Sequence, residues 1–198
     1  MKALLDELLK KIPNIEQIIS FSFDVFVHPQ KDNGVLNNGV EFVRPYINDY
    51  KYLLICFDFE GCGKENQGIE VLESRLVEQL NSNGWKDRNQ SIIFNPELEI
   101  WLWVDDSKIH ELLDWEDKKS IYNWIEDKGF KFKEGVKKPI RPKEAFEAAL
   151  RYQKIPKSSS LYAQLAQTAS YKKCHDPAFN KFIGLIQKWF SNSSLKSE

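Results

Sequence analysis

The feature that most constrains the fold is a short run of apolar residues that ends in an acid. Residues 52–57 read YLLICF without a polar interruption, and Asp58 follows directly. A run of this length without alternation is typical of a strand buried on both faces, as in a parallel sheet covered by helices. The sequence therefore predicts an α/β core built around this run.

The residues on either side of the run extend that prediction. Apolar residues recur at helical spacing over residues 69–80, and residues 91–94 form another short apolar run. Strand, helix and strand in this order predict a right-handed βαβ unit in a mostly parallel sheet. Alternation over residues 18–27 predicts a further strand with one polar face. Pro, Gly and Asn in residues 28–39 predict a loop, and a short helix is expected at 41–46.

Helical patterns dominate the rest of the chain. The first residues, MKALLDELLKKI, form an amphipathic pattern, and Pro96 with ELEIWLWV after it predicts a helix in which Trp101 and Trp103 pack into a core. A connector rich in Gly, Pro and Lys, KGFKFKEGVKKPIRP, is the candidate domain boundary. Two short helices are expected before this connector, around 109–113 and 121–125. Three more are expected after it, at 143–152, 158–169 and 177–190, and Asp176 is the expected N-cap of the last one.

The net charge of −1 hides a strong asymmetry along the chain. Residues 1–136 carry 16 basic and 25 acidic side chains, whereas residues 137–198 carry 12 basic and 4 acidic ones. We therefore expect an α/β domain over residues 1–136 and a basic helical C-terminal region over residues 137–198. A basic region is where a polyanion or an acidic partner surface would bind.

The composition predicts a cytoplasmic protein without membrane contact. No stretch approaches the roughly 20 apolar residues of a membrane span, and Asp6 and Glu7 do not suit a signal peptide. Three cysteines at irregular spacing, Cys56, Cys62 and Cys174, do not suit a secreted disulfide framework.

The strongest candidate site is acidic. Asp58 and Glu60 follow the buried run, at the edge where parallel sheets bind ligands, and two carboxylates at this spacing can reach one Mg²⁺. Glu97 or Glu99 would stand near the same edge if it follows the next strand, and Asp24 could join from the polar face of the first strand. Four converging acids are typical of a two-metal phosphoryl-transfer site. The alternative is that these acids are solvated or cap helices.

Two other motifs are weaker evidence for a functional site. Gly61, Gly63 and Lys64 precede a helix but lack the spacing of a Walker phosphate loop, so a plain connection is favoured. The His and Cys residues have no spacing that would clamp zinc, and Cys174 and His175 cannot act as nucleophile and base by adjacency alone.

The basic side chains of the C-terminal region are a second candidate site. They could follow a phosphate backbone, bind an acidic partner subunit, complement the acidic half of the same chain, or form an ordinary solvated surface. The candidates are spread over connectors and helix ends: Lys137, Lys138, Arg141, Lys143, Arg151, Lys154, Lys157, Lys172 and Lys173.

Two segments resemble known bacterial families. LLICFDFEG, a helix and then IIFNPELEIWLWVDD resemble Toprim-related proteins of the RloB-like and DUF4276 groups, in which Asn95, Pro96, Glu99 and Trp101 would match a signature turn. The later segment KSSSLYAQLAQTASYKKCHDPAFNKFIGLIQKWF resembles the C-terminal part of small components of methylation-associated anti-phage defence systems.

The resemblance implies a small, mostly parallel Toprim-like sheet flanked by helices, with Asp58, Glu60 and Glu99 in the places of the family's metal-binding and catalytic acids. The chain has Asp24 and Val25 where active Toprim enzymes carry Glu, usually followed by Gly, and Glu60 where they carry Asp. We therefore expect an accessory subunit of a multi-protein anti-phage defence system that contacts other subunits and DNA or RNA. The alternative is a Mg²⁺-dependent nuclease that cleaves phosphodiesters.

Overall fold

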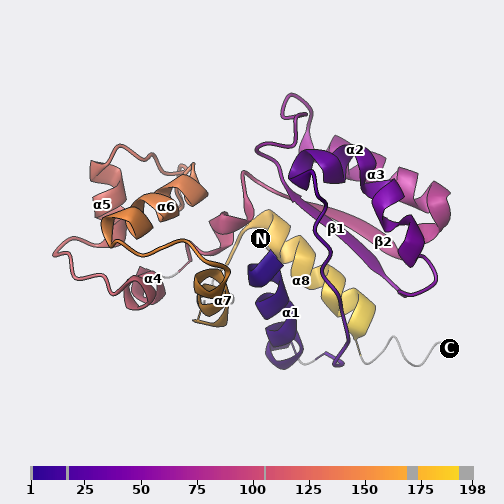
Figure 1. The fold of residues 1–198 in the computed structure, drawn as a ribbon, viewed down its shortest axis with the longest axis horizontal. Coiled ribbons are helices and arrows are strands. Elements are labelled where there is room, and N and C mark those ends of the chain that lie inside the picture. The colour runs from indigo at the N-terminus through magenta and orange to yellow at the C-terminus, as the bar shows by residue number, and fades with distance from the viewer. Residues whose placement is uncertain (1, 17, 105, 169–173, 192–198) are drawn as a thin grey trace. The chain divides into compact units, whose positions relative to one another are not determined.

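The protein has an α/β fold with a small parallel sheet and a helical C-terminal region. The computed structural model describes residues 2–16, 18–104, 106–168 and 174–191, and within these it has eight α-helices and one two-stranded sheet. Figure 1 labels these elements, and the chain divides into two compact units. We call Phe26–Glu97 the sheet unit, and Met1–Val25 together with Leu98–Glu198 the helical unit. The predicted fold class is confirmed.

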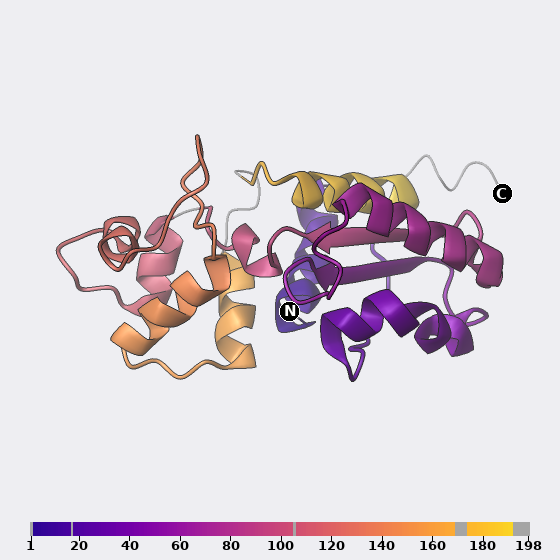
Figure 2. The same ribbon diagram turned by 90° about the horizontal axis from the view of Figure 1, so that it is seen from above.

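The sheet unit is the βαβ unit that the apolar runs predict. Strands β1 (Leu53–Asp58) and β2 (Asn89–Phe94) pair in parallel, with Asp58 opposite Phe94, and α3 (Ile69–Leu80) connects them. Figure 2 shows the two strands side by side between α2 (Lys31–Val43) and α3. Apolar side chains from all four elements form the core: Leu36, Val43, Ile55, Phe57, Leu72, Leu76, Leu80 and Ile93.

The loop predicted over residues 28–39 is wrong, because most of this segment belongs to α2, and the residues after it form a 3₁₀ turn, Arg44–Tyr46. The two glycines of this helix differ in how closely their neighbours pack. A Cβ on Gly34 would collide with the His28 ring and would lie 2.6 Å from the Cβ of Gln30. A Cβ on Gly39 would lie 3.5 Å from Cδ1 of Ile55 on β1, so this side of α2 can lie close to the strand.

The strand predicted over residues 18–27 is also wrong, since residues 18–28 form neither helix nor strand. Within the helical unit, the amide of Ile19 donates to the carbonyl oxygen of Phe190 at 3.0 Å. The rings of Phe21 and Phe190 stack with their centroids 4.0 Å apart. Phe21 of the alternating segment therefore packs against the end of α8, and none of the described strands pairs with this segment.

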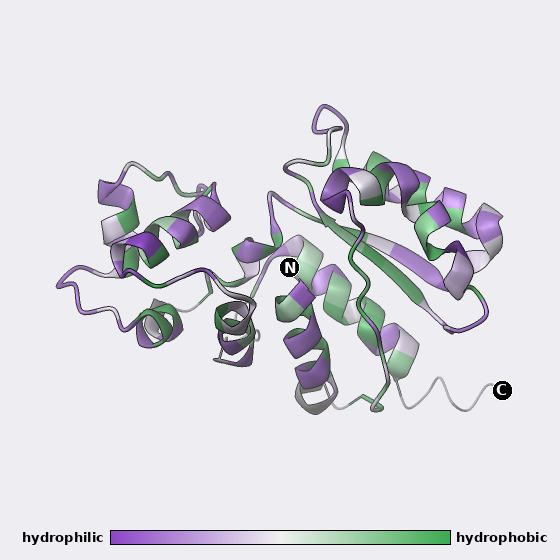
Figure 3. Cartoon of the chain, viewed as in Figure 1, coloured by the Kyte–Doolittle hydropathy of each residue, from purple (hydrophilic) through white to green (hydrophobic). Residues whose placement is uncertain are grey.

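The helical unit contains the other predicted helices. Helix α1 (Lys2–Glu16) contacts α7 (Ser159–Thr168), and α8 (Pro177–Phe190) ends the described chain apart from Ser191. Figure 3 shows hydrophobic residues along β1 and α8. The remaining helices are α4 (Asp106–Leu113), α5 (Ile121–Asp127) and α6 (Pro142–Tyr152).

The helix expected from Pro96 onward is wrong, because only a 3₁₀ turn, Leu98–Trp101, forms there. The side chains of this segment are nevertheless packed in the core. Trp101 and Trp103 are buried, as predicted, and Nε1 of Trp103 donates to the carbonyl oxygen of Pro142 at 3.0 Å. Tertiary contacts rather than helical hydrogen bonds therefore hold the segment.

Two further observations concern the predicted domain boundary and membrane contact. The boundary drawn after Val136 from charge and composition lies inside the helical unit, and the charge-based division stays a prediction. In the described residues, no helix is both long and apolar enough to cross a membrane.

Candidate functional site

The carboxyl end of β1 carries two of the predicted acids. Asp58 is the last residue of the strand and is buried, and its amide donates to Oδ1 of Asp32 at 3.0 Å. Glu60 is exposed, and its amide donates to the carbonyl oxygen of Pro96 at 3.0 Å. Asp32, in the first turn of α2, is an acid at this edge that the sequence did not indicate, because its segment read as a loop.

The other predicted acids are distributed over both units. Glu97 is buried just beyond β2 in the sheet unit, whereas Glu99 is buried in the 3₁₀ turn of the helical unit, and Asp24 is exposed in that same unit. Among the described residues, no group of three or more His, Cys, Asp or Glu side chains is arranged to hold a metal ion. The Mg²⁺ site therefore stays a prediction from the sequence, without a ready set of ligands.

The glycine-rich segment after β1 does not form a phosphate loop. The amides of Gly61 and Gly63 both donate to Oε1 of Glu65, at 2.9 and 3.1 Å. These hydrogen bonds lower the pKa of Glu65, the largest effect coming from its own amide and the next from that of Gly63. A carboxylate of the chain itself thus occupies the amides that a phosphate would need.

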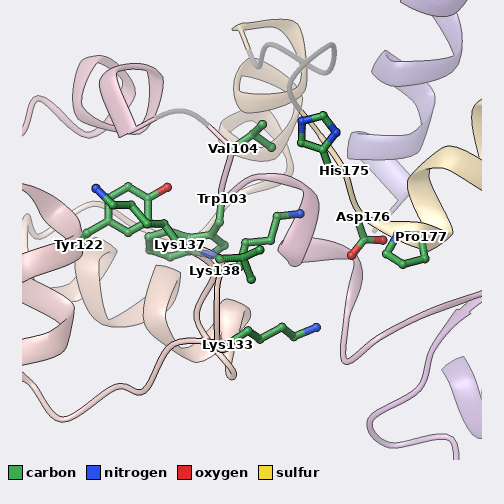
Figure 4. Close-up of a pocket in the computed structure, with 10 residues that line it drawn as sticks. Trp103, Val104, Tyr122, Lys133, Lys137, Lys138, His175, Asp176 and Pro177 are labelled. Carbon is green, nitrogen blue, oxygen red and sulfur yellow. The ribbon is translucent and has the colours of Figure 1, made fainter.

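The helical unit contains a cavity of about 470 Å³ whose wall is rich in lysine. We call it the basic pocket. Figure 4 shows the lysines and the aromatic residues on one side of it and His175, Asp176 and Pro177 on the other. It is lined by Trp103, Val104, Tyr122, Lys133, Val136, Lys137, Lys138, His175, Asp176 and Pro177.

One short hairpin carries all three lysines of the pocket lining. The amide of Lys133 donates to the carbonyl oxygen of Lys138 at 2.9 Å, and Phe132 pairs with Pro139 in an antiparallel bridge. Gly135, with a φ of 73°, supplies the left-handed conformation of the turn, which a glycine adopts at little cost. The predicted connector is thus an ordered element that carries Lys133, Lys137 and Lys138.

The opposite wall is the start of α8. Oδ1 of Asp176 accepts hydrogen bonds from the amides of Ala178 and Phe179, at 3.1 and 3.3 Å, so Asp176 is the N-cap that the sequence predicts. The same oxygen accepts from Nε1 of Trp101 at 3.1 Å. The carboxylate on the pocket wall is therefore already engaged by three donors.

A cysteine joins the two walls. Nζ of Lys138 lies 3.7 Å from Sγ of Cys174, the residue that precedes His175. Burial raises the pKa of the Cys174 thiol, and the charge of Lys138 opposes part of that rise. Because the thiolate is the reactive form, this rise disfavours reaction at Cys174.

The predicted basic residues divide into two groups. Lys137 and Lys138 line the basic pocket. The second group lies on or beside α6: Arg141 forms an ion pair with Glu144 at 3.8 Å, Lys143 lies on the helix, and Lys154 and Lys157 follow it. Lys157 is paired with Glu147. Lys172 and Lys173 lie outside the described residues.

Sequence reasoning missed Lys133 and His175 as pocket residues. The signal for Lys133 was the stretch 134–137 with Gly135 that separates it from Lys138, since a loop of about 3 to 5 residues that contains glycine is typical of a hairpin. His175 offered no such signal, because only the tertiary fold brings residue 175 beside residues 133–138.

Comparison with known proteins adds no relative: no family model, no curated protein and no solved structure matches this chain.

Proposed function

We propose that this chain is a cytoplasmic accessory subunit of a bacterial multi-protein anti-phage defence system, and that it binds DNA or RNA through the basic pocket. The observation that carries the binding role is the gathering of Lys133, Lys137 and Lys138 around one cavity. The lining contains three lysines and one carboxylate, that of Asp176, which already accepts three hydrogen bonds. Such a pocket favours an anion.

The wall chemistry favours a nucleic acid over an acidic protein segment. Besides the lysines, the pocket is lined by the apolar residues Val104, Val136 and Pro177, while the rings of Trp103 and Tyr122, with centroids 5.6 Å apart, are almost fully buried. Lysines bind phosphate as mobile point charges, and the apolar side chains beside them offer contact area to sugars and bases. The membership of a defence complex rests on the sequence resemblance alone.

A salt titration tests the binding role. We expect a labelled single-stranded oligonucleotide to bind in a filter assay with an affinity that falls steeply between about 50 and 200 mM salt, because binding releases counterions from phosphates. Lys137→Gln should weaken binding, while Lys131→Gln, the same charge change on the hairpin but outside the pocket lining, should have a smaller effect. Absence of binding at low salt to both DNA and RNA would contradict the proposal.

The defence-complex role has its own test. Tagged protein recovered from its own host should bring down a constant set of other subunits, and the same set should be recovered after nuclease treatment. Recovery of the tagged chain alone would leave only the nucleic-acid role.

A second candidate is a Mg²⁺-dependent nuclease, favoured by the burial of Asp58 at the carboxyl end of β1 with Glu60 two residues later. In such an enzyme Asp58 and Glu60 would hold the metal, and a metal-activated water would attack the phosphodiester. Cleavage that needs Mg²⁺, is lost in Asp58→Asn and is kept in the exposed control Asp87→Asn would support it. Cleavage that is absent, or equal in both variants, would exclude it.

A further inference from the structure

We propose that the basic pocket is a receptor for the phosphomonoester of a nucleotide, an inference that rests on the proposed nucleic-acid binding and names the group that is recognised. The ligand chemistry is a terminal phosphate on a nucleoside, either at the end of a strand or on a free mononucleotide. Three features of the pocket lead to this class: the spacing of its lysines, its charge, and its size with its apolar lining.

The hairpin places two lysines at the spacing of one phosphate. Lys133 and Lys138 are a cross-strand pair, because the amide of Lys133 bonds to the carbonyl oxygen of Lys138. Side chains of such a pair leave the backbone about 5 Å apart. Both line the same cavity, so their two ammonium groups can reach oxygens of a single phosphate.

The charge of the pocket suits a dianion. Lys137 adds a third positive charge to the lining, with its side chain extending toward Tyr122 and away from those of Lys133 and Lys138 (Figure 4), and His175 adds a ring nitrogen at the opposite side. A phosphodiester inside a strand carries one negative charge, whereas a phosphomonoester carries about 1.5 to 2 at pH 7. The pair Lys133 and Lys138, with Lys137 farther along the lining, therefore favours a strand end or a free nucleotide over the interior of a strand.

The size and lining provide for the rest of the nucleotide. A cavity of about 470 Å³ lies within the range of small-molecule sites. Beside the lysines, Val104, Val136 and Pro177 supply the apolar part of the lining, whereas Trp103 and Tyr122 are buried. This surface suits the apolar faces of a ribose and a base next to the bound phosphate.

The test compares two oligonucleotides that differ in one group. A 3′-labelled 12-mer with a 5′-phosphate and the same 12-mer with a 5′-hydroxyl are titrated by fluorescence anisotropy, each as DNA and as RNA. We expect the phosphorylated strand to bind about tenfold more tightly, because charge-assisted hydrogen bonds to the phosphate are among the stronger ones. Equal binding of the two strands overturns the phosphate pocket but leaves nucleic-acid binding intact; binding of neither overturns the proposed function itself.

Variants locate the effect. The double variant Lys133→Gln/Lys137→Gln should bring the ratio of the two affinities close to one, while Lys131→Gln should keep it, and circular dichroism checks that each variant is folded. A ratio that survives in the double variant overturns the assignment to this pocket.

A competition arm separates the two sources of the phosphate. Displacement of the phosphorylated strand by adenosine 5′-monophosphate, but not by adenosine, supports a pocket open to free nucleotides. A preference for the phosphorylated strand that the mononucleotide does not compete supports a pocket that reads strand ends.

Discussion

The indole Nε1 of Trp101 donates a hydrogen bond to Oδ1 of Asp176 at 3.1 Å, across 75 positions of the sequence. The same oxygen caps α8 through the amides of Ala178 and Phe179. The ring of Trp101 also packs edge-on against Phe179, with centroids 5.0 Å apart. One carboxylate therefore fixes the start of α8, satisfies a buried indole and forms part of the wall of the basic pocket.

Replacing this carboxylate should cost more than an ordinary helix cap. We expect Asp176→Ala to lower the free energy of unfolding by about 2 to 4 kcal/mol, because it removes the cap and leaves the buried N–H of Trp101 without an acceptor. Asp176→Asn keeps an oxygen acceptor at the same place and should lose clearly less. Urea unfolding measures both, and equal losses for the two variants would contradict the role of the acceptor.

The two glycines of α2 should respond in opposite ways to alanine. Gly34→Ala introduces a Cβ against the His28 ring and should destabilise the protein by about 1 to 3 kcal/mol, as overpacking does. Gly39→Ala is the matched control, since its Cβ would meet Ile55 at an ordinary distance. Because alanine favours helix, Gly39→Ala should be neutral or stabilising by up to about 1 kcal/mol. Thermal unfolding that ranks the two variants the other way would contradict this packing.

The acid stability of the protein should depend in part on Glu65. Hydrogen bonds from the amides of Glu65, Gly63 and Gly61 lower its pKa in the folded state, so its contribution to stability is present above the ordinary glutamate value. That contribution is lost as the pH falls through the lowered value. The difference in urea midpoint between wild type and Glu65→Gln should therefore shrink as the pH falls from 6 toward 3. A constant difference would show that the carboxylate charge plays no part.

The cysteines should differ in reactivity. Burial raises the pKa of Cys62 and of Cys174, whereas the Cys56 side chain is partly exposed. The thiolate is the reactive form, so Cys62 and Cys174 should react slowly with iodoacetamide at pH 8 in the folded protein and quickly in urea. Mass spectrometry of the digested protein follows each site, with Cys56 as internal reference. Alkylation of Cys174 at the unfolded rate would contradict the burial of this thiol.

The local pattern of the sequence was sufficient for three elements. The apolar run before Asp58 is β1, the helical spacing over residues 69–80 is α3, and Asp176 with Pro177 begins α8. In each case the local pattern and the tertiary environment favour the same conformation. The residues predicted at the end of β1, Asp58 and Glu60, stand there for the same reason, because the end of a buried strand is visible in the sequence.

The errors occurred where the local signal and the packing differ. Gly34 and Gly39 indicate a loop by propensity, yet both lie in α2, where the absence of a Cβ on Gly34 allows the close approach of the His28 ring. Alternation in residues 18–27 indicates a strand, but a strand needs a neighbour for its hydrogen bonds. In the structure Phe21 stacks on Phe190 instead.

The sequence by itself determined the α/β class, the two parallel strands, most helices, and the accumulation of positive charge toward the C-terminal end. Only the tertiary structure decided which of those charges form a site. Lys133 and Lys138 meet because a hairpin turns at Gly135, and His175 joins them because α8 begins beside that hairpin. The periodicity of a segment indicates which of its faces is buried. A pocket depends on contacts between segments that are far apart in the sequence, and no local pattern indicates those contacts.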